Sequence, residues 1–168
     1  MKDQFILIYD QYFDDVYRYV LLKVGNKWDT DDIVSDIFRK VFEKIHTTRE
    51  IENVKAWLMI IARHTVIDHY RKRREVTLGD DVERYTYPVL FEDRLEKVDD
   101  LVCLKKSIQR LEKEELEIMN LHYFCEMKYK EIGDVLGKTE SAIKMKSSRL
   151  IKKITIFVRQ CLEESENG

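Results

Sequence analysis

The sequence is poor in the residues that end helices, with one proline and five glycines among its 168 residues. So few helix breakers predict long helices and few turns. No apolar run approaches the roughly 20 residues that a membrane-spanning helix needs, and the N-terminus lacks the small-residue cleavage site of a signal peptide. The three cysteines, Cys103, Cys125 and Cys161, form no CxxC pair, so we expect reduced thiols rather than a disulfide framework, in a cytoplasmic protein.

Motifs of common enzyme classes are also missing. The sequence has no P-loop, no GxGxxG, no HExxH and no GxSxG. Its four histidines show no metal-ligand spacing, since the two nearest ones, His64 and His69, would lie about 140° apart on a helix. We therefore expect no catalytic residues, no metal ion and no cofactor.

Charge is unevenly distributed along the chain, although the formal net charge is only −2. Residues 75–100 carry three basic and nine acidic residues, whereas the segments before and after each carry two more basic than acidic residues. An acidic segment with no sustained periodicity is typical of a linker. The sequence thus predicts an N-terminal domain over 1–74, an acidic linker over 75–100 and a C-terminal domain over 101–168.

Hydrophobic periodicity predicts an all-α fold of two small helical domains, an N-terminal helical bundle and a C-terminal four-helix domain. The first helix carries an apolar stripe from Phe5 to Val20. Thr30 is the expected N-cap of a second helix, which buries residues including Phe42 and Ile45. The remaining helices are expected at about 54–74, 101–110, 113–124, 128–136 and 139–158, with a short helix near Leu95 and a frayed C-terminal tail.

The most informative segment is residues 128–154, where a short helix, a glycine and a basic helix follow one another. Gly137 marks the turn and Thr139 is the expected N-cap of the second helix. A helical projection places Ile143, Ser147, Leu150, Ile151 and Ile154 on a buried face. The opposite face holds Lys144, Met145, Ser148, Arg149 and Lys152, with Lys146 and Lys153 beside it. This pattern is typical of a helix-turn-helix unit that reads the major groove of DNA.

A second basic patch ends the third helix, with the run RKRR at 71–74. The helix dipole alone favours cations at this end, so the run also has a purely structural explanation. His64, Ile67 and Arg71 form a separate line at i, i+3 and i+7, and Trp57 adds a flat ring. Mixtures of cations and flat side chains are typical of surfaces that bind single-stranded nucleic acid.

Together these segments resemble the extracytoplasmic-function class of bacterial RNA polymerase sigma factors. DDIVSDIFRKVFEKI is similar to the family's polymerase-binding helix, with Ser35 in place of Gln. VKAWLMIIARHTVIDHYRKRR is similar to its WLxxIARNxxxDxxRRxxR segment, with His64 in place of Asn. EIGDVLGKTESAIKMKSSRLIKKI is similar to EIAxxLGxSxGTVKSRLxRARxxL, with Met145 in place of Ser. We expect His64 to alter the −10 preference, and Met145, together with Ala142 and Ile151, which replace Thr and Arg, to alter the −35 preference.

The resemblance implies core RNA polymerase, promoter DNA and an anti-sigma factor as partners, a role in stress response, and no stable homo-oligomer. It also implies that the acidic linker runs towards the polymerase active-site channel, and that an anti-sigma factor holds the protein near the membrane. The implied core-polymerase contacts are Asp32, Ser35, Asp36, Arg39 and Lys40. The implied −10 contacts are Thr47, Thr48, Arg49, Asn53, Trp57, His64 and Arg71, and the implied −35 contacts are Lys144, Met145, Lys146, Ser148, Arg149 and Lys152.

Three other functions remain open on the residues alone. A helix-turn-helix repressor or activator would bind DNA without polymerase. A helical adaptor or anti-regulator would bind a protein partner and no DNA. A nucleic-acid enzyme is disfavoured because catalytic and metal-binding motifs are missing.

Overall fold

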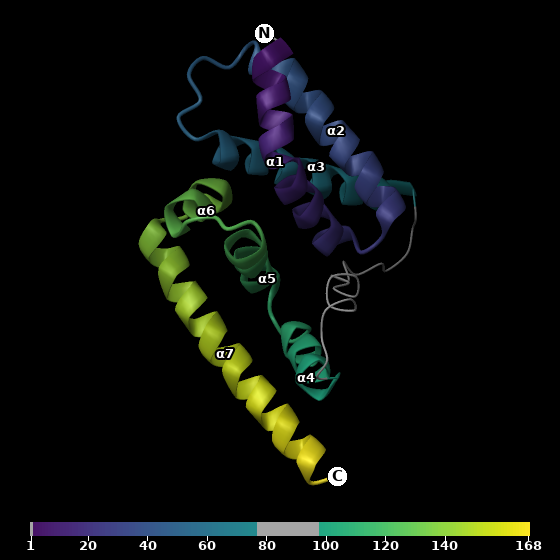
Figure 1. Cartoon of the computed structure of the whole chain (residues 1–168), viewed down its shortest axis with the longest axis vertical. Helices are drawn as coiled ribbons and strands as arrows, with labels where there is room; N and C mark the ends of the chain where they lie inside the picture. The colour runs from purple at the N-terminus through teal and green to yellow at the C-terminus, as the bar shows by residue number, and fades with distance from the viewer. Residues whose placement is uncertain (1, 77–97) are drawn as a thin grey trace.

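The computed structural model describes residues 2–76 and 98–168, and all regular structure in these two stretches is helical (Figure 1). This confirms the all-α prediction. The N-terminal module contains α1 (Lys2–Val24), α2 (Lys27–Ile45) and α3 (Val54–Val76). The C-terminal module contains α4 (Val98–Ile108), α5 (Lys113–Met119), the π-helix η1 (Asn120–Phe124), α6 (Tyr129–Leu136) and α7 (Glu140–Glu166).

The N-terminal module is built around the apolar stripe of α1. Val16 and Val20 are fully buried, and aromatic rings extend the stripe towards the N-terminus. The ring of Phe38 on α2 lies 4.7 Å from that of Tyr9 and 5.9 Å from that of Phe13, measured between centroids. Such tilted and stacked aromatic pairs are stabilising beyond the area that they bury. They hold α2 with one side against α1 and the other exposed.

Two details of α2 differ from the prediction. The helix begins at Lys27 because the side chain of Asn26 accepts a hydrogen bond from the Asp29 amide at 2.9 Å. Thr30, the predicted cap, lies one turn inside the helix, where its buried hydroxyl donates to the Asn26 carbonyl at 2.7 Å. Phe42 was predicted to be buried but is 44% exposed, because it lies at the edge of the bundle and packs on one side against the ring of Phe5.

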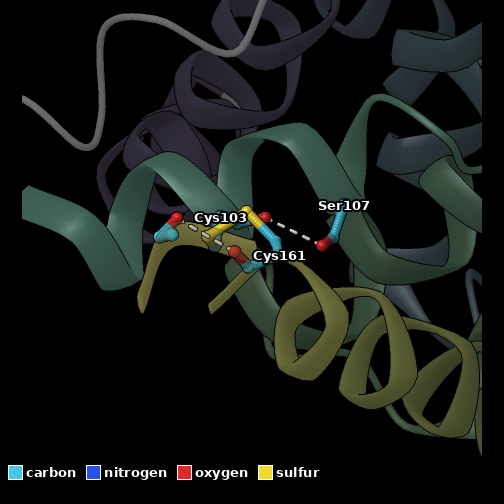
Figure 2. Close-up of a disulfide and its surroundings, with 4 residues drawn as sticks. Cys103, Ser107 and Cys161 are labelled. Carbon is cyan, nitrogen blue, oxygen red and sulfur yellow. Dashed lines mark hydrogen bonds between the residues drawn. A yellow bond between two sulfur atoms is a disulfide. The ribbon is translucent and has the colours of Figure 1, made fainter. Parts of the chain in front are cut away.

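The C-terminal module differs from prediction at its end, where α7 continues to Glu166 instead of fraying. Its final turns run beside α4 (Figure 1), and the guanidinium of Arg110 lies 5.1 Å from the centroid of the Phe157 ring. A disulfide between Cys103 on α4 and Cys161 on α7 joins the two helices (Figure 2). The prediction of reduced thiols was therefore wrong for this pair, whose 58-residue separation gives no local sequence signal. Cys125 is a buried free thiol.

The predicted linker overlaps the helices at both ends, since α3 continues to Val76 and α4 begins at Val98. The intervening residues, including the short helix expected near Leu95, lie outside the described residues.

The two modules pack against each other, which the sequence did not predict. Buried side chains of α1–α3 and of α5–α7 form one continuous apolar cluster. The contacts between modules are made chiefly by α3 with α6 and by α1 with η1. Both surfaces with a predicted role in DNA binding therefore belong to one packed body.

Candidate nucleic-acid interface

The helix-turn-helix is built by α6, a tight turn and the first half of α7. Gly137 adopts φ 66° and ψ 38°, a left-handed conformation that favours glycine because it has no Cβ. The Lys138 amide then donates to the Gly133 carbonyl at 2.9 Å and ends α6. Thr139 caps α7 by accepting a hydrogen bond from the Ala142 amide at 3.2 Å, as predicted. Turn and cap together set the angle at which α7 leaves α6.

The exposed side of α7, which we call the recognition face, carries Lys144, Met145, Ser148, Arg149 and Lys152. All five are exposed, and Met145 is 55% exposed. On the opposite side, Ile143, Ser147 and Leu150 are buried and pack α7 onto its module. Ile151, predicted to be buried, is 40% exposed because it lies at the margin of that packed face. A helix held from behind and cationic in front is suited to entering a DNA groove.

Two further cations of α7 are held by acids of α5. Lys146 lies 2.7 Å from Glu114 and Lys153 lies 2.9 Å from Glu115, measured between nitrogen and oxygen. The hydrogen bond from Lys146 is the main reason why the pKa of Glu114 lies below its ordinary value. Lys146 must therefore leave or share Glu114 before it can contact a phosphate, whereas Arg149 is already exposed.

The loop between α2 and α3 holds four of the residues predicted to contact the −10 element. The hydroxyls of Thr47 and Thr48 donate to the Lys44 carbonyl at the end of α2, at 3.0 and 2.9 Å. Arg49 is exposed. Asn53 accepts a hydrogen bond from the Ala56 amide at 2.9 Å and thereby caps α3. Both ends of this loop are thus tied to helices.

The other three predicted −10 residues lie on α3 and differ in exposure. His64 is exposed, and Arg71 is exposed beside Asp68, 3.5 Å away. Trp57 is partly buried and packs against the core. The structure therefore leaves His64 and Arg71 accessible to a ligand, and leaves part of the Trp57 side chain accessible.

The five residues of α2 predicted to bind polymerase share one side of that helix. Asp32 and Ser35 are exposed. Asp36 pairs with Arg39 and, at 3.2 Å, with Lys40, which also donates to Thr65 on α3 at 3.1 Å. Partial burial acts to raise the pKa of Asp36. The hydrogen bonds from Arg39 and Lys40 outweigh this, and the pKa of Asp36 lies below its ordinary value. The surface is therefore a preformed network of charges.

Sequence reasoning missed a set of polar contacts between the modules. Asn53, a predicted −10 residue, donates to Glu131 of α6 at 2.9 Å. Arg18 donates to the Phe124 carbonyl at 2.8 Å, and Lys55 donates to the Cys125 carbonyl. Carbonyls at a helix C-terminus lack intrahelical partners and carry partial negative charge. Two cations of the N-terminal module thus cap η1 of the C-terminal module.

The same interface contains a largely buried ion cluster formed by Tyr19, Lys23, Arg63 and Glu117. Glu117, on α5, accepts a hydrogen bond from the Tyr19 hydroxyl and pairs with the Lys23 ammonium, and the Arg63 guanidinium lies 3.6 Å away. Tyr19, Lys23 and Glu117 are buried. Burial raises the pKa of Tyr19, with the Glu117 charge adding to the effect, and burial lowers the pKa of Lys23. All three partners of this carboxylate come from the other module.

The described residues contain neither a metal-binding group nor a membrane-spanning helix. Across residues 2–76 and 98–168, no three His, Cys, Asp or Glu side chains are placed to share a metal ion. In these stretches, no helix combines the length and the apolar character needed to span a bilayer.

Comparison with known families assigns both modules. Residues 8–76 match the family model of Sigma-70 region 2, and residues 101–154 match that of Sigma-70 region 4. The first match covers nearly all of α1–α3, and the second covers the helix-turn-helix together with the preceding helices α4 and α5. The chain belongs to the extracytoplasmic-function sigma factors of the sigma-70 family. This family consists of transcription initiation factors, not enzymes.

Individual sigma factors match over most of this chain. The ECF RNA polymerase sigma factor BldN of Streptomyces coelicolor is 32% identical over 154 residues, which cover 89% of this chain and 58% of BldN. The ECF RNA polymerase sigma factor SigM of Bacillus subtilis is 29% identical over 138 residues, which cover 82% of this chain and 84% of SigM. This chain thus spans little more than half the length of BldN but most of the length of SigM.

Two solved structures have the same fold. CnrH, in complex with the cytosolic domain of CnrY, superposes with a TM-score of 0.69 at 18% identity, covering 95% of this chain and 90% of CnrH. RpoE of Bartonella quintana, in complex with the anti-sigma factor NepR, superposes with a TM-score of 0.69 at 23% identity, covering 94% of this chain and 96% of RpoE. At these identities the likeness establishes the fold alone.

We expect the ion cluster around Glu117 to contribute to the free energy of unfolding of this sigma factor. Replacing Glu117 with Ala leaves the buried Lys23 and Tyr19 without their acceptor, and removing one partner of a buried pair costs about 3–5 kcal/mol. Chemical denaturation should show this loss. The matched control is Glu43→Ala, which removes an exposed partner of Arg39 and should cost less than about 1 kcal/mol. Equal unfolding midpoints for Glu117→Ala and the unsubstituted protein would contradict the role of the cluster.

Proposed function

We propose that this protein is an alternative sigma factor, which binds core RNA polymerase, recognises −35 and −10 promoter elements and promotes initiation of transcription. The observation that carries the proposal is the recognition face of α7, which is cationic and exposed on a helix packed from behind, within the match to Sigma-70 region 4. As such, the protein works in the cytoplasm, beside polymerase and DNA.

In this proposal the C-terminal module reads the −35 element. Lys144, Arg149 and Lys152 give the recognition face its positive charge, and Met145 and Ser148 add apolar and hydrogen-bonding groups. Arginine is well suited to contact base edges, because its planar guanidinium donates two parallel hydrogen bonds to guanine. Lys146, beside this face, acts mainly on phosphates.

The N-terminal module reads the −10 element and binds core polymerase. The loop from Thr47 to Asn53, with Trp57, His64 and Arg71, forms the −10 surface. Reading a base in separated strands requires it to leave the stack, which costs a few kcal/mol. The His64 imidazole carries two ring nitrogens that can form hydrogen bonds with such a base. Asp32, Ser35, Asp36, Arg39 and Lys40 of α2 form the polymerase contact.

Promoter binding by this protein requires the two modules to separate. The −10 and −35 elements lie about 25 base pairs apart, or roughly 85 Å at 3.4 Å per base pair. Here a −10 residue, Asn53, is hydrogen-bonded to the first helix of the helix-turn-helix. The 21 residues between α3 and α4 can span at most about 70 Å when extended. Added to the length of α7 alone, 27 residues or about 40 Å at 1.5 Å per residue, that reach is sufficient for both elements.

An anti-sigma factor is the proposed regulatory partner. The solved relatives CnrH and RpoE are each bound to another protein, which for RpoE is named an anti-sigma factor. A partner that binds the packed arrangement more tightly than the separated one would shift the population towards the packed form. Tethering of the protein near the membrane would follow if that partner were itself anchored there.

The polymerase contact can be tested by exchanging two charges on α2. The double variant Asp36→Arg, Arg39→Asp retains the ion pair between the two positions, so the helix should remain folded while its outward charge pattern is reversed. We expect loss of co-purification with core polymerase and loss of promoter-specific transcription in a reconstituted assay. Glu163→Lys, an exposed charge change at the far end of α7, is the matched control. Full transcription by the folded double variant would overturn the contact, and binding of DNA without any response to polymerase would favour a conventional regulator.

The −35 contact can be tested on Arg149. Arg149→Ala should weaken promoter binding by about 1–3 kcal/mol and relax selectivity at one base pair, whereas Lys146→Ala should weaken all sequences alike and reduce the salt dependence. Binding of the polymerase holoenzyme to a library randomised in the −35 element measures both effects. Arg159→Ala, on the same helix beyond the matched region, should change neither. If Arg149→Ala behaves like Arg159→Ala, the recognition face is assigned incorrectly.

A further inference from the structure

The disulfide between α4 and α7 is not explained by the match to Sigma-70 region 4. Cys103 lies within the match to Sigma-70 region 4, but Cys161 lies beyond its last matched residue, 154. The bond therefore depends on the extended end of α7. Its Cα atoms are 5.5 Å apart, a separation that a disulfide bridges without movement of the backbone. Protein disulfides in a reducing cytoplasm are usually transient and redox-sensing.

We propose that Cys103 and Cys161 form a reversible thiol–disulfide site, in which Cys161 exchanges with small-molecule thiols and disulfides and Cys103 completes the bond. This inference rests on the proposed function only in placing the protein in a reducing compartment.

The two sulfurs have different access to solvent. Cys103 is 1% exposed on the inner side of α4, whereas Cys161 is partly exposed. Figure 2 shows the pair between the two helices, with Ser107 donating to the Cys103 carbonyl at 2.8 Å. Thiol–disulfide exchange needs an approach to the attacked sulfur, so access decides which cysteine reacts first. Cys161 is therefore the cysteine that reacts with the external disulfide in oxidation and with the external thiol in reduction.

The exchange balances with a glutathione-type disulfide as the oxidant. The Cys161 thiolate attacks one sulfur of that disulfide, forms a mixed disulfide and releases one thiolate. The Cys103 thiolate then attacks the Cys161 sulfur and releases the second. Two protein thiols lose two protons and two electrons, and the oxidant becomes two thiols. In reduction, an external thiolate attacks Cys161, Cys103 leaves as a thiolate, and a second external thiol frees Cys161.

Bond formation has a local structural consequence for region 4. The disulfide closes a loop of chain from residue 103 to residue 161 that contains the whole helix-turn-helix. The recognition face lies on an earlier part of α7 than Cys161. Beyond residue 154, α7 has few buried side chains, and its contact with α4 includes the stacking of Arg110 on Phe157. Oxidation should therefore hold the last turns of α7 on α4, and reduction should let them open more often.

Cys125 serves as an internal control in the same chain. It is fully buried, and burial raises its pKa to about 12, which leaves very little thiolate at neutral pH. Buried thiols of this kind are inert.

The test uses the full-length protein, reduced, freed of reductant and exposed to glutathione disulfide at neutral pH, with intact-mass and peptide analysis. We expect the unsubstituted protein to form the 103–161 bond with no stable adduct. Cys103→Ser should retain one glutathione on Cys161, and Cys161→Ser should retain none.

Hydrogen exchange of residues 155–166 should be slower in the oxidised than in the reduced protein, a comparison that needs no variant. A glutathione adduct on Cys103, no bond in the unsubstituted protein, or equal exchange in both states would overturn the proposal. None of these measurements involves polymerase or DNA, so failure of the redox site would not affect the proposed transcription function.

Discussion

The packing of the two modules of this sigma factor depends on the interactions of the Glu117 carboxylate. This carboxylate lies on α5 in the C-terminal module, yet Tyr19, Lys23 and Arg63, which surround it, all belong to the N-terminal module. A buried charge is tolerated only when it is paired, so each module carries groups that the other must satisfy. Separation of the modules would return these groups to water, where they are solvated again. The cluster therefore specifies how the modules pack without making their packing irreversible.

The same interface connects the proposed −10 surface to the module proposed to read the −35 element. Asn53, from the loop proposed to read the −10 element, donates a hydrogen bond to Glu131. Partial burial acts to raise the pKa of Glu131, but the hydrogen bonds from Asn53 and from the Lys128 amide outweigh it, and the pKa lies below its ordinary value. Arg18 and Lys55 cap η1, and π-helical turns of this kind are frequent at functional sites. The recognition face of α7 and the charged side of α2 remain exposed meanwhile. Packing thus covers one end of the proposed −10 surface and leaves the other two proposed surfaces accessible.

Features set by neighbouring residues could be predicted from the sequence. The all-α class, the turn at Gly137, the cap at Thr139 and the exposed side of α7 all follow from local propensity and a period of 3.6 residues. The start of α2 was misplaced because Asn26 and Thr30 are both good caps, and tertiary packing buries Thr30. Contacts between distant residues could not be predicted: Tyr19 and Glu117 are 98 positions apart, and Cys103 and Cys161 are 58 apart. Neither pair leaves a periodic signal. The assignments of individual residues to DNA and polymerase stay predictions.

We propose that the modules, which are packed against each other in the free protein, separate when a promoter is bound. Energy transfer between fluorophores introduced at Asp14 and Lys130 tests it most directly. Both side chains are exposed and lie outside the proposed DNA and polymerase surfaces, next to Asp15 and Glu131, which contact the other module. We expect efficient transfer in the free protein and little transfer in a transcriptionally active complex with core polymerase and promoter DNA. Equally efficient transfer in that active complex would contradict the claim.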